Sequence, residues 1–203
     1  MLSTRPTYTL LFGVCLIILT ITAVVLSNNS TPQDDQTASV ASVANSNTAV
    51  ELFNDLQFAS PDIGSQEFIP PSFTCDGEEV SPSFVLSRPA PETRSFALSI
   101  VDRSEKAPWV QLLIWDIPIT VRSIDSGELV HGVYGSNATG YDDYLGPCPK
   151  KGDRAHEYEF TLYELDQASL NLAKGSTEEE FQIAARAHIV DTHRFKKSYQ
   201  RVN

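Results

Sequence analysis

A histidine stands where a proline-bracketed loop becomes a strand-like run in "GPCPKKGDRAHEYEFTLYELD", residues 146 to 166. Alternation along the run places His156, Tyr158, Phe160 and Leu162 on one face. The prolines restrict the backbone of the preceding loop. An imidazole and a phenol at the end of an apolar row, beside a restrained loop, are typical of the wall of a binding pocket.

Two other strand-like runs each carry one polar group in an apolar row. In "RSFALSIVD" the row Phe96, Leu98, Ile100 ends at Asp102, and in "WVQLLIWDI" Gln111 shares a face with bulky apolar residues. A buried carboxylate or amide costs roughly 1–3 kcal/mol unless it is hydrogen-bonded. We therefore expect Asp102, Gln111 and His156 to meet one another or a ligand.

The elements that must position these residues are mostly strands. Residues 176 to 190 predict one helix, because Ser176 and Glu179 form a capping box and apolar residues follow at helical spacing through Val190. Six runs bounded by turn residues predict strands: 66–69, 83–87, 94–102, 109–117, 128–133 and 156–165. The residues alone therefore predict a mainly β domain with a few peripheral helices.

The other histidines show no pattern that marks a site. His188 lies on the apolar face of the predicted helix and is expected in the core, whereas His131 and His193 are interpreted as surface residues. Trp109 and Trp115 are interpreted as core residues rather than a stacking platform, with Trp109 at the border of the pocket as the alternative.

The N-terminal segment, residues 1–26, contains an uncharged apolar run from residue 8 to residue 26. The run approaches the roughly 20 residues that span a bilayer. An uncleaved anchor and a cleaved signal peptide both fit, because small residues end the run. Arg5 precedes it and Asp34 and Asp35 follow it, which predicts a domain outside the cytoplasm, either membrane-anchored or secreted.

Length and charge limit the organisation and the partners. Residues 27–50 are rich in Ser, Asn, Thr and Ala and predict a linker, so the folded domain is expected over 51–203. With 41% hydrophobic and 20% charged residues, the 203-residue chain fits one globular domain. The net charge of −11 argues against a nucleic-acid partner, because the sequence has no basic stripe that could neutralise phosphates.

Sequence patterns of catalysis are absent. The chain has no Gly-x-Ser-x-Gly, His-Glu-x-x-His, phosphate-binding loop or Cys-x-x-Cys. A histidine near an aspartate could act as a general base, but no activated nucleophile accompanies it. We expect a protein that is not an enzyme and that uses neither a cofactor nor a metal.

These segments together resemble the phosphatidylethanolamine-binding protein family, especially its bacterial and archaeal members, which are related to the Raf kinase inhibitor protein. The resemblance runs from Phe68 to Arg201. "FIPPSFTCDGEEVSPSF" resembles the family's entry motif, and "RSFALSIVD" resembles the strand that ends in its site aspartate. "WVQLLIWDIP" is similar to its Trp-x-His strand, and residues 146 to 166 are similar to its Gly-Pro-x-Pro loop and His-x-Tyr strand. "AARAHIVDTHRFKKSYQR" resembles its closing helix and tail.

The resemblance implies a large central antiparallel sheet, a smaller second sheet and a few peripheral helices. It also implies a pocket at one end of the central sheet that binds phosphate-type anions and phospholipid head groups. A protonated imidazole beside a carboxylate would donate charge-assisted hydrogen bonds to a phosphate oxygen. Gln111 stands where the family has a histidine, which keeps a donor and loses a titratable charge. Matched by position, the ligand-binding residues are Asp102, Gln111, Gly146, Pro147, His156 and Tyr158.

The implied function is non-enzymatic binding of a small phosphate-type anion or phospholipid head group, by a domain held near the membrane through its N-terminal segment. An inhibitor of an extracytoplasmic hydrolase is the alternative, because family members in other organisms inhibit enzymes. The expected partners are accordingly the anion or head group, the membrane and, in the alternative, a protein.

Cys75 and Cys148 are the two cysteines outside the apolar N-terminal run. Each lies beside a rigid turn, and an oxidising compartment would favour their pairing. A disulfide between them would attach the pocket loop to the entry segment. Two buried free thiols remain the alternative, since pairing requires Cα atoms within roughly 7 Å.

Overall fold

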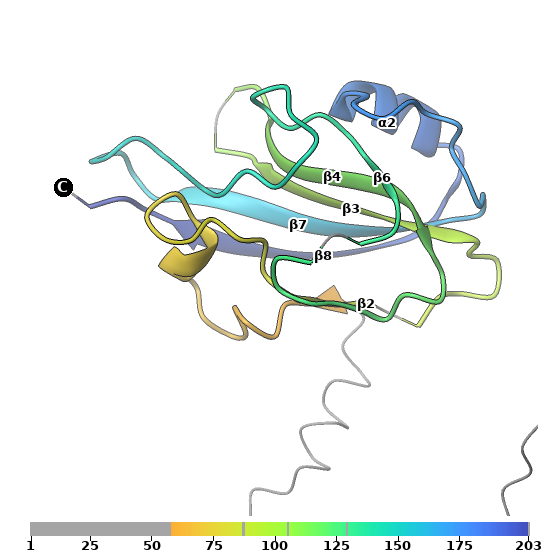
Figure 1. Ribbon diagram of the computed structural model, residues 1–203, viewed down its shortest axis with the longest axis horizontal. Coiled ribbons are helices and arrows are strands. Elements are labelled where there is room, and N and C mark those ends of the chain that lie inside the picture. The colour runs from red at the N-terminus through yellow and green to blue at the C-terminus, as the bar shows by residue number, and fades with distance from the viewer. Residues whose placement is uncertain (1–57, 87, 105, 129, 203) are drawn as a thin grey trace, which may run out of the picture. The chain divides into compact units, whose positions relative to one another are not determined.

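A five-stranded antiparallel sheet with the order β6-β4-β3-β7-β8 runs through the middle of the domain (Figure 1). The computed structural model describes residues 58–86, 88–104, 106–128 and 130–202. The strands of this central sheet are β3 (Ser95–Asp102), β4 (Trp109–Pro118), β6 (Val133–Tyr134), β7 (His156–Leu165) and β8 (Ile189–Tyr199).

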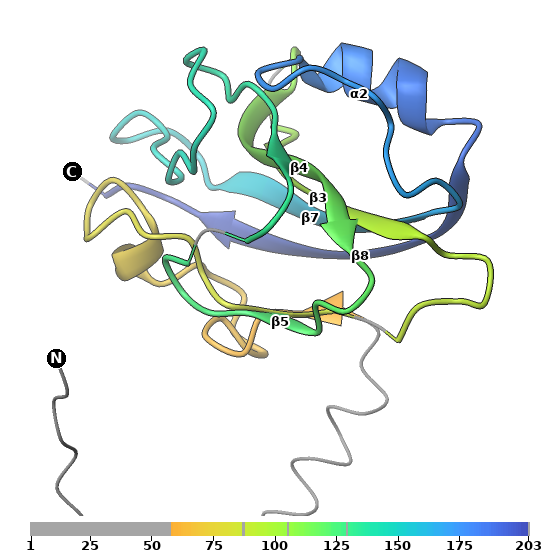
Figure 2. The same ribbon diagram turned by 45° about the vertical axis from the view of Figure 1, so that its right-hand side comes forward.

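A second antiparallel sheet of three short strands, in the order β1-β2-β5, covers one face of the central sheet, and helix α2 (Glu178–Ala185) lies over the other face (Figures 1 and 2). The short strands are β1 (Phe58–Ala59), β2 (Phe84–Leu86) and β5 (Ser123–Ile124), and a 3-10 helix, η1, spans Pro71–Phe73. The predicted mainly β fold with a large antiparallel sheet and a smaller second one is confirmed.

Alternation along the strands divides the core into two layers. On β7, Tyr158, Phe160 and Leu162 pack toward the small sheet, whereas Tyr163 and Leu165 pack toward α2. Aromatic rings join the two sheets, since Phe84 of β2 contacts Phe160 of β7 with ring centroids 6.2 Å apart. The alternation that the sequence predicted for residues 156 to 162 is therefore present, with its apolar face in the larger layer.

Two predicted strands are wrong in extent. Residues 66–69 form only an isolated bridge between Phe68 and Ser198, because the prolines that follow cannot donate to a ladder and lead into η1. The run predicted over 128–133 pairs only at Val133–Tyr134, after a bend that includes Gly132. A Cβ at Gly132 would come within 2.8 Å of the Ile114 side chain, so this close approach to β4 requires glycine.

The helix predicted through Val190 is also wrong in extent. Its N-cap is Thr177, which forms the capping box with Glu180 one residue later than the predicted pair. It ends at Ala185, and an 11-residue strand, β8, begins at Ile189 and pairs with β7 along its length. The segment read as a closing helix and tail therefore joins the central sheet, because pairing with β7 satisfies its backbone and overrides its local helical spacing.

Two histidines differ from their sequence interpretation. His193, expected at the surface, is 9% exposed on β8 and lies 3.1 Å from Glu164 Oε1 through its Nε2. His188, expected in the helical core, lies in the turn after α2, where its partly exposed ring contacts Asp166 Oδ1 at 2.9 Å. His131 is exposed as expected.

Of the two tryptophans interpreted as core residues, one is buried and the other is exposed. Trp115 is fully buried, as expected, whereas the Trp109 side chain at the start of β4 is 47% exposed and borders a pocket.

The predictions of an N-terminal anchor or signal over 1–26 and of a linker over 27–50 fall on residues outside those that the structure describes, as do the first seven residues of the domain predicted over 51–203. Within the described ranges, no helix has both the length and the apolar character needed to cross a membrane.

Candidate functional site

A cavity of about 220 Å³ opens at one end of the central sheet, where β3 ends and β4 and β7 begin. The antiparallel register causes this convergence, because Asp102 pairs with both Trp109 and Tyr158. The cavity is lined by Asp102, Trp109, Gln111, Cys148, Pro149, Lys150, Asp153, His156 and Tyr158. Four of the six predicted ligand residues therefore meet at one cavity.

A buried histidine–aspartate pair forms one wall of this cavity. His156 Nδ1 lies 2.7 Å from Asp102 Oδ2, and both side chains are buried. The other oxygen, Asp102 Oδ1, accepts the backbone N–H of Ser104 at 2.8 Å, so the carboxylate cannot rotate freely. Because a carboxylate accepts hydrogen bonds, the contact holds a proton on Nδ1 and fixes the orientation of the imidazole.

Tyr158 supplies a neutral phenol beside this pair. Its side chain is buried, and burial raises the pKa of Tyr158 well above its usual value. The negative charge of Asp102 and a hydrogen bond to its carboxylate raise the pKa of Tyr158 further. The hydroxyl therefore remains a neutral hydrogen-bonding group over the physiological pH range.

Gln111 reaches the cavity through a β-bulge. Ile100 pairs with Leu112 and Val101 with Val110, which leaves Gln111 as an extra residue on β4. The residue is 1% exposed, and its Oε1 has no hydrogen-bond partner among the described residues. The amide thus retains hydrogen-bonding capacity that a bound molecule could use.

The structure does not bring Gly146 and Pro147 to the cavity lining. The Gly146 N–H donates to Glu79 Oε1 at 3.1 Å, and the Pro147 carbonyl accepts the N–H of Cys75 at 3.3 Å. The next residues of the same loop line the cavity instead, among them Lys150. Gly146 is required for a close approach, since a Cβ there would come within 2.8 Å of the Glu79 side chain.

Lys150 and Asp153 are lining residues that the sequence reasoning missed. Lys150 is exposed and borders the cavity. In the sequence, the feature that could have identified these two residues is their position between the Gly-Pro-x-Pro loop and His156. The cavity thus combines the Lys150 ammonium and the His156 imidazole with two carboxylates, of which Asp102 is paired with His156.

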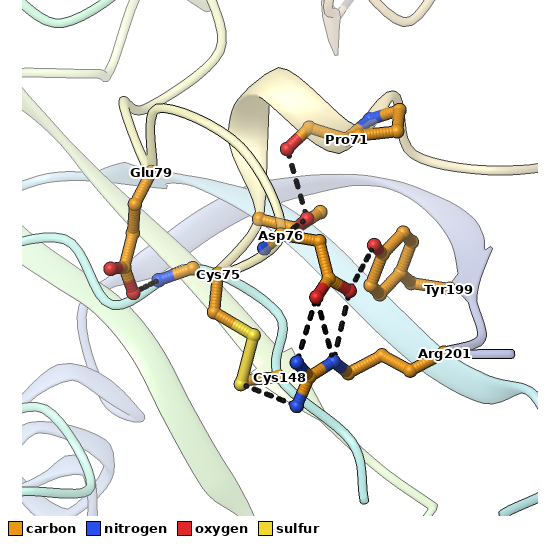
Figure 3. The surroundings of a disulfide bond; sticks show 9 residues. Pro71, Cys75, Asp76, Glu79, Cys148, Tyr199 and Arg201 are labelled. Atoms are coloured by element: carbon orange, nitrogen blue, oxygen red, sulfur yellow. Dashed lines mark hydrogen bonds and ion pairs between the residues drawn. A yellow bond between two sulfur atoms is a disulfide. The ribbon is translucent and has the colours of Figure 1, made fainter. Parts of the chain in front are cut away.

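The Gly-Pro-x-Pro loop, which contains Cys148, is held in place by the predicted disulfide between Cys75 and Cys148. The Cα atoms of the two cysteines lie 5.4 Å apart (Figure 3). Asp76 adds a second fastening, because it accepts hydrogen bonds from Arg201 Nη2 at 2.7 Å and from the Tyr199 hydroxyl at 2.8 Å (Figure 3). Arg201 Nη1 also lies 3.4 Å from Cys148 Sγ. The end of β8, the entry segment and the pocket loop are therefore joined beside the cavity.

This cluster predicts a pH dependence of stability. Hydrogen bonds from Arg201 and then from Tyr199 hold the pKa of Asp76 below its ordinary value of 3.8. A lowered carboxyl pKa stabilises the fold fully above the ordinary value, and this stabilisation is lost as the pH falls below it. Across a pH series of melting temperatures, wild type should therefore exceed Asp76→Asn by a constant margin from about pH 7 to 5 and by a shrinking margin below about pH 4.

Glu92→Gln, which alters an exposed carboxyl with no described partner, is the control and should follow wild type over the whole series. A margin between wild type and Asp76→Asn that persists unchanged at pH 2.5 would contradict the role given to Asp76.

The fold and this cavity together define a binding protein with a small polar pocket at a sheet end. Comparison with known families identifies the family to which this binding protein belongs. The family model described as "Phosphatidylethanolamine-binding protein" matches residues 59–200, so the chain belongs to the phosphatidylethanolamine-binding protein family. The family recognised from the sequence motifs is thereby confirmed.

Relatives occur in archaea and bacteria. A UPF0098 protein of Pyrococcus abyssi is 31% identical over 147 residues, which cover 68% of this chain and 82% of the relative. Among solved structures, a phosphatidylethanolamine-binding protein homologue of Chlamydia trachomatis matches with a TM-score of 0.66 and 27% identity, covering 71% of this chain and 97% of its own. Escherichia coli YbcL, described as a member of the mammalian family, matches with the same TM-score, identity and coverage.

Proposed function

We propose that the chain binds a small phosphate-type anion, free or as a phospholipid head group, in the cavity at the end of the central sheet, without catalysing a reaction. The histidine–aspartate pair carries this proposal. Asp102 holds the imidazole at Nδ1, and a protonated imidazole in that position offers positive charge to an anion at the cavity wall.

The surrounding groups suit the same ligand. The Lys150 ammonium adds a second positive charge at the cavity mouth, and the Tyr158 phenol and Gln111 amide add neutral polar groups inside it. The volume of about 220 Å³ suits a phosphate ester with a short substituent better than a whole lipid. The acyl chains of a phospholipid would therefore stay outside the cavity.

Titration calorimetry on the full-length chain tests this assignment. Inorganic phosphate and phosphoethanolamine are expected to bind at pH 6, and His156→Gln should weaken binding at least about tenfold through loss of a charge-assisted hydrogen bond. Gln111→His should strengthen it, because a second titratable donor would face the cavity. Tighter binding of phosphoethanolamine than of phosphate would point to a head group, and the reverse to the free anion.

His131→Gln is the matched control for His156→Gln, because it makes the same change at an exposed histidine outside the cavity. Lys150→Gln is a second test that does not disturb the core, and it should weaken binding by about two- to fivefold. Equal affinities in wild type, His156→Gln and Lys150→Gln would refute the proposed site. Absence of heat with every phosphorylated probe, together with capture of a stoichiometric protein from an envelope extract, would favour the inhibitor alternative.

The proposal also places the domain outside the cytoplasm, held at the membrane or secreted. Two observations support this location: the Cys75–Cys148 disulfide, which is typical of oxidising compartments, and the order of Arg5, apolar run and acidic residues in the sequence. Protease added to intact cells should degrade the domain while a cytoplasmic marker survives. Protection of the domain until the cells are permeabilised would contradict this location.

A further inference from the structure

A second cavity, of about 250 Å³, lies between the two sheets. Its wall is apolar and comes from strands of both sheets, with Phe84 of β2 and Ile124 of β5 on one side and Leu98, Leu112 and Ile114 of β3 and β4 on the other. An apolar cavity of roughly 150 Å³ is already large enough to bind benzene in another protein. This cavity therefore has room for an apolar group somewhat larger than a benzene ring.

The lining of the second cavity also includes three exposed carboxylates, Glu79, Glu128 and Asp143. Within the described part of the chain, no Lys, Arg or His lines the cavity and none of these carboxylates forms an ion pair. Each accepts one hydrogen bond from an uncharged N–H group: Glu79 from the Gly146 backbone, Glu128 from the Asp125 backbone and Asp143 from the Asn137 side chain. These neutral contacts fix the carboxylates at the rim and leave their negative charge uncompensated by a cation.

The polar groups inside the cavity do not favour an anion. The hydroxyls of Tyr134 and Tyr144 donate to the backbone carbonyls of Val130 and Phe73, at 3.4 and 2.7 Å. Burial raises the pKa of Tyr144, and the negative charge of Glu79 raises it further, so the field of this carboxylate reaches the cavity wall. An anionic ligand would meet repulsion and find these two donors already engaged.

We propose that the cavity between the sheets is a second binding site, which takes a small molecule with an apolar body and a single ammonium-type cation. The apolar body would occupy the space between Phe84 and Leu112, where it is removed from water. The cation would remain at the rim near Glu79, Glu128 and Asp143, partly hydrated and attracted by their charge.

The second cavity and the anion cavity share no lining residue. The two cavities approach each other at β4, where Leu112 lines the cavity between the sheets and the preceding residue, Gln111, lines the cavity at the sheet end. They also select opposite charges. A ligand of the second site should therefore bind in the presence of saturating phosphate.

Calorimetry with 3-phenylpropylamine on the full-length chain tests the second site. We expect a dissociation constant on the order of 0.1–1 mM, with binding at least about fivefold weaker for the neutral 3-phenylpropanol. The anionic 3-phenylpropionate should give no measurable heat. Backbone amide NMR shifts on addition of the amine should fall on Leu112, Ile114 and Gly127 rather than on Trp109 and His156.

The rim variants Glu128→Gln and Asp143→Asn keep the size and hydrogen-bonding oxygen of each side chain and remove its charge. Each should weaken amine binding by about two- to threefold, and the double variant should bind amine and alcohol nearly equally. Glu92→Gln makes the same change in charge at an exposed position outside the cavity and should leave the affinity unchanged.

Three outcomes would overturn the proposal: no binding of the amine, equal affinity of wild type for amine and alcohol, or NMR shifts confined to the anion cavity. None of them depends on whether phosphate binds. Because both rim residues are exposed, their variants should retain the wild-type melting temperature, which separates loss of binding from loss of folding.

Discussion

Reduction of the Cys75–Cys148 disulfide is expected to lower the free energy of unfolding by about 4 kcal/mol. The bond joins residues that are 73 positions apart, so it removes a large amount of chain entropy from the unfolded state. The hydrogen bonds from Arg201 and Tyr199 to Asp76 remain after reduction and continue to hold the folded segments together. Urea denaturation of the full-length chain, followed by tryptophan fluorescence with and without a reductant, measures the difference.

The double variant Cys75→Ser/Cys148→Ser should unfold at the midpoint of the reduced wild type and should not respond to the reductant. Cys15→Ser is the control, because Cys15 lies in the apolar N-terminal run, and it should respond as wild type does. A midpoint that is the same with and without reductant in wild type would mean that this bond does not stabilise the fold by restricting the unfolded chain.

The strands that carry the candidate site could be predicted because they are long and regularly patterned. The eight residues of β3 and the ten residues of β7 give clear runs, and the shared face of His156 and Tyr158 follows from alternation alone. On β4 the prediction that Gln111 shares a face with the bulky apolar residues of its run was only partly right. The bulge at Gln111 inserts one residue into the ladder, so Leu113 and Trp115 pack toward α2.

The rest of the fold depends on contacts that a single sequence does not display. Strands β1 and β5 are two residues long, too short for any alternation, and exist because β2 pairs with both. Strand β8 begins within a helical pattern and is a strand because β7 offers an unpaired edge. Lys150 reaches the cavity because a disulfide positions its loop, which local sequence spacing cannot reveal.

A buried carboxylate on β7 also depends on contacts that the sequence does not display. Glu164 is 2% exposed, and its Oε2 accepts the Ala90 N–H at 2.8 Å and the Thr93 hydroxyl at 2.6 Å. Its Oε1 lies 3.1 Å from His193 Nε2 on the neighbouring strand. In the sequence this glutamate is one acidic residue in an alternating run, and only the β7–β8 register and the β2–β3 loop show that it is enclosed.

Glu164→Ala is expected to lower the free energy of unfolding by about 3–5 kcal/mol. The substitution removes the acceptor for the Ala90 N–H and the Thr93 hydroxyl, and it leaves His193 without this buried carboxylate beside it. Glu164→Gln keeps one acceptor oxygen and should cost about 1–2 kcal/mol. Urea denaturation measures both losses, and hydrogen exchange of the Ala90 amide should accelerate in Glu164→Ala because its acceptor is gone.

Glu157→Ala is the matched control, since it makes the same substitution on the same strand. Glu157 is exposed and pairs with Lys196 Nζ at 2.7 Å, so its loss should cost less than about 1 kcal/mol. The difference between the two variants isolates the effect of burial, because charge, side-chain length and strand are the same. Equal losses in Glu164→Ala and Glu157→Ala, or an unchanged exchange rate at Ala90, would show that Glu164 does not hold the β2–β3 loop against the central sheet.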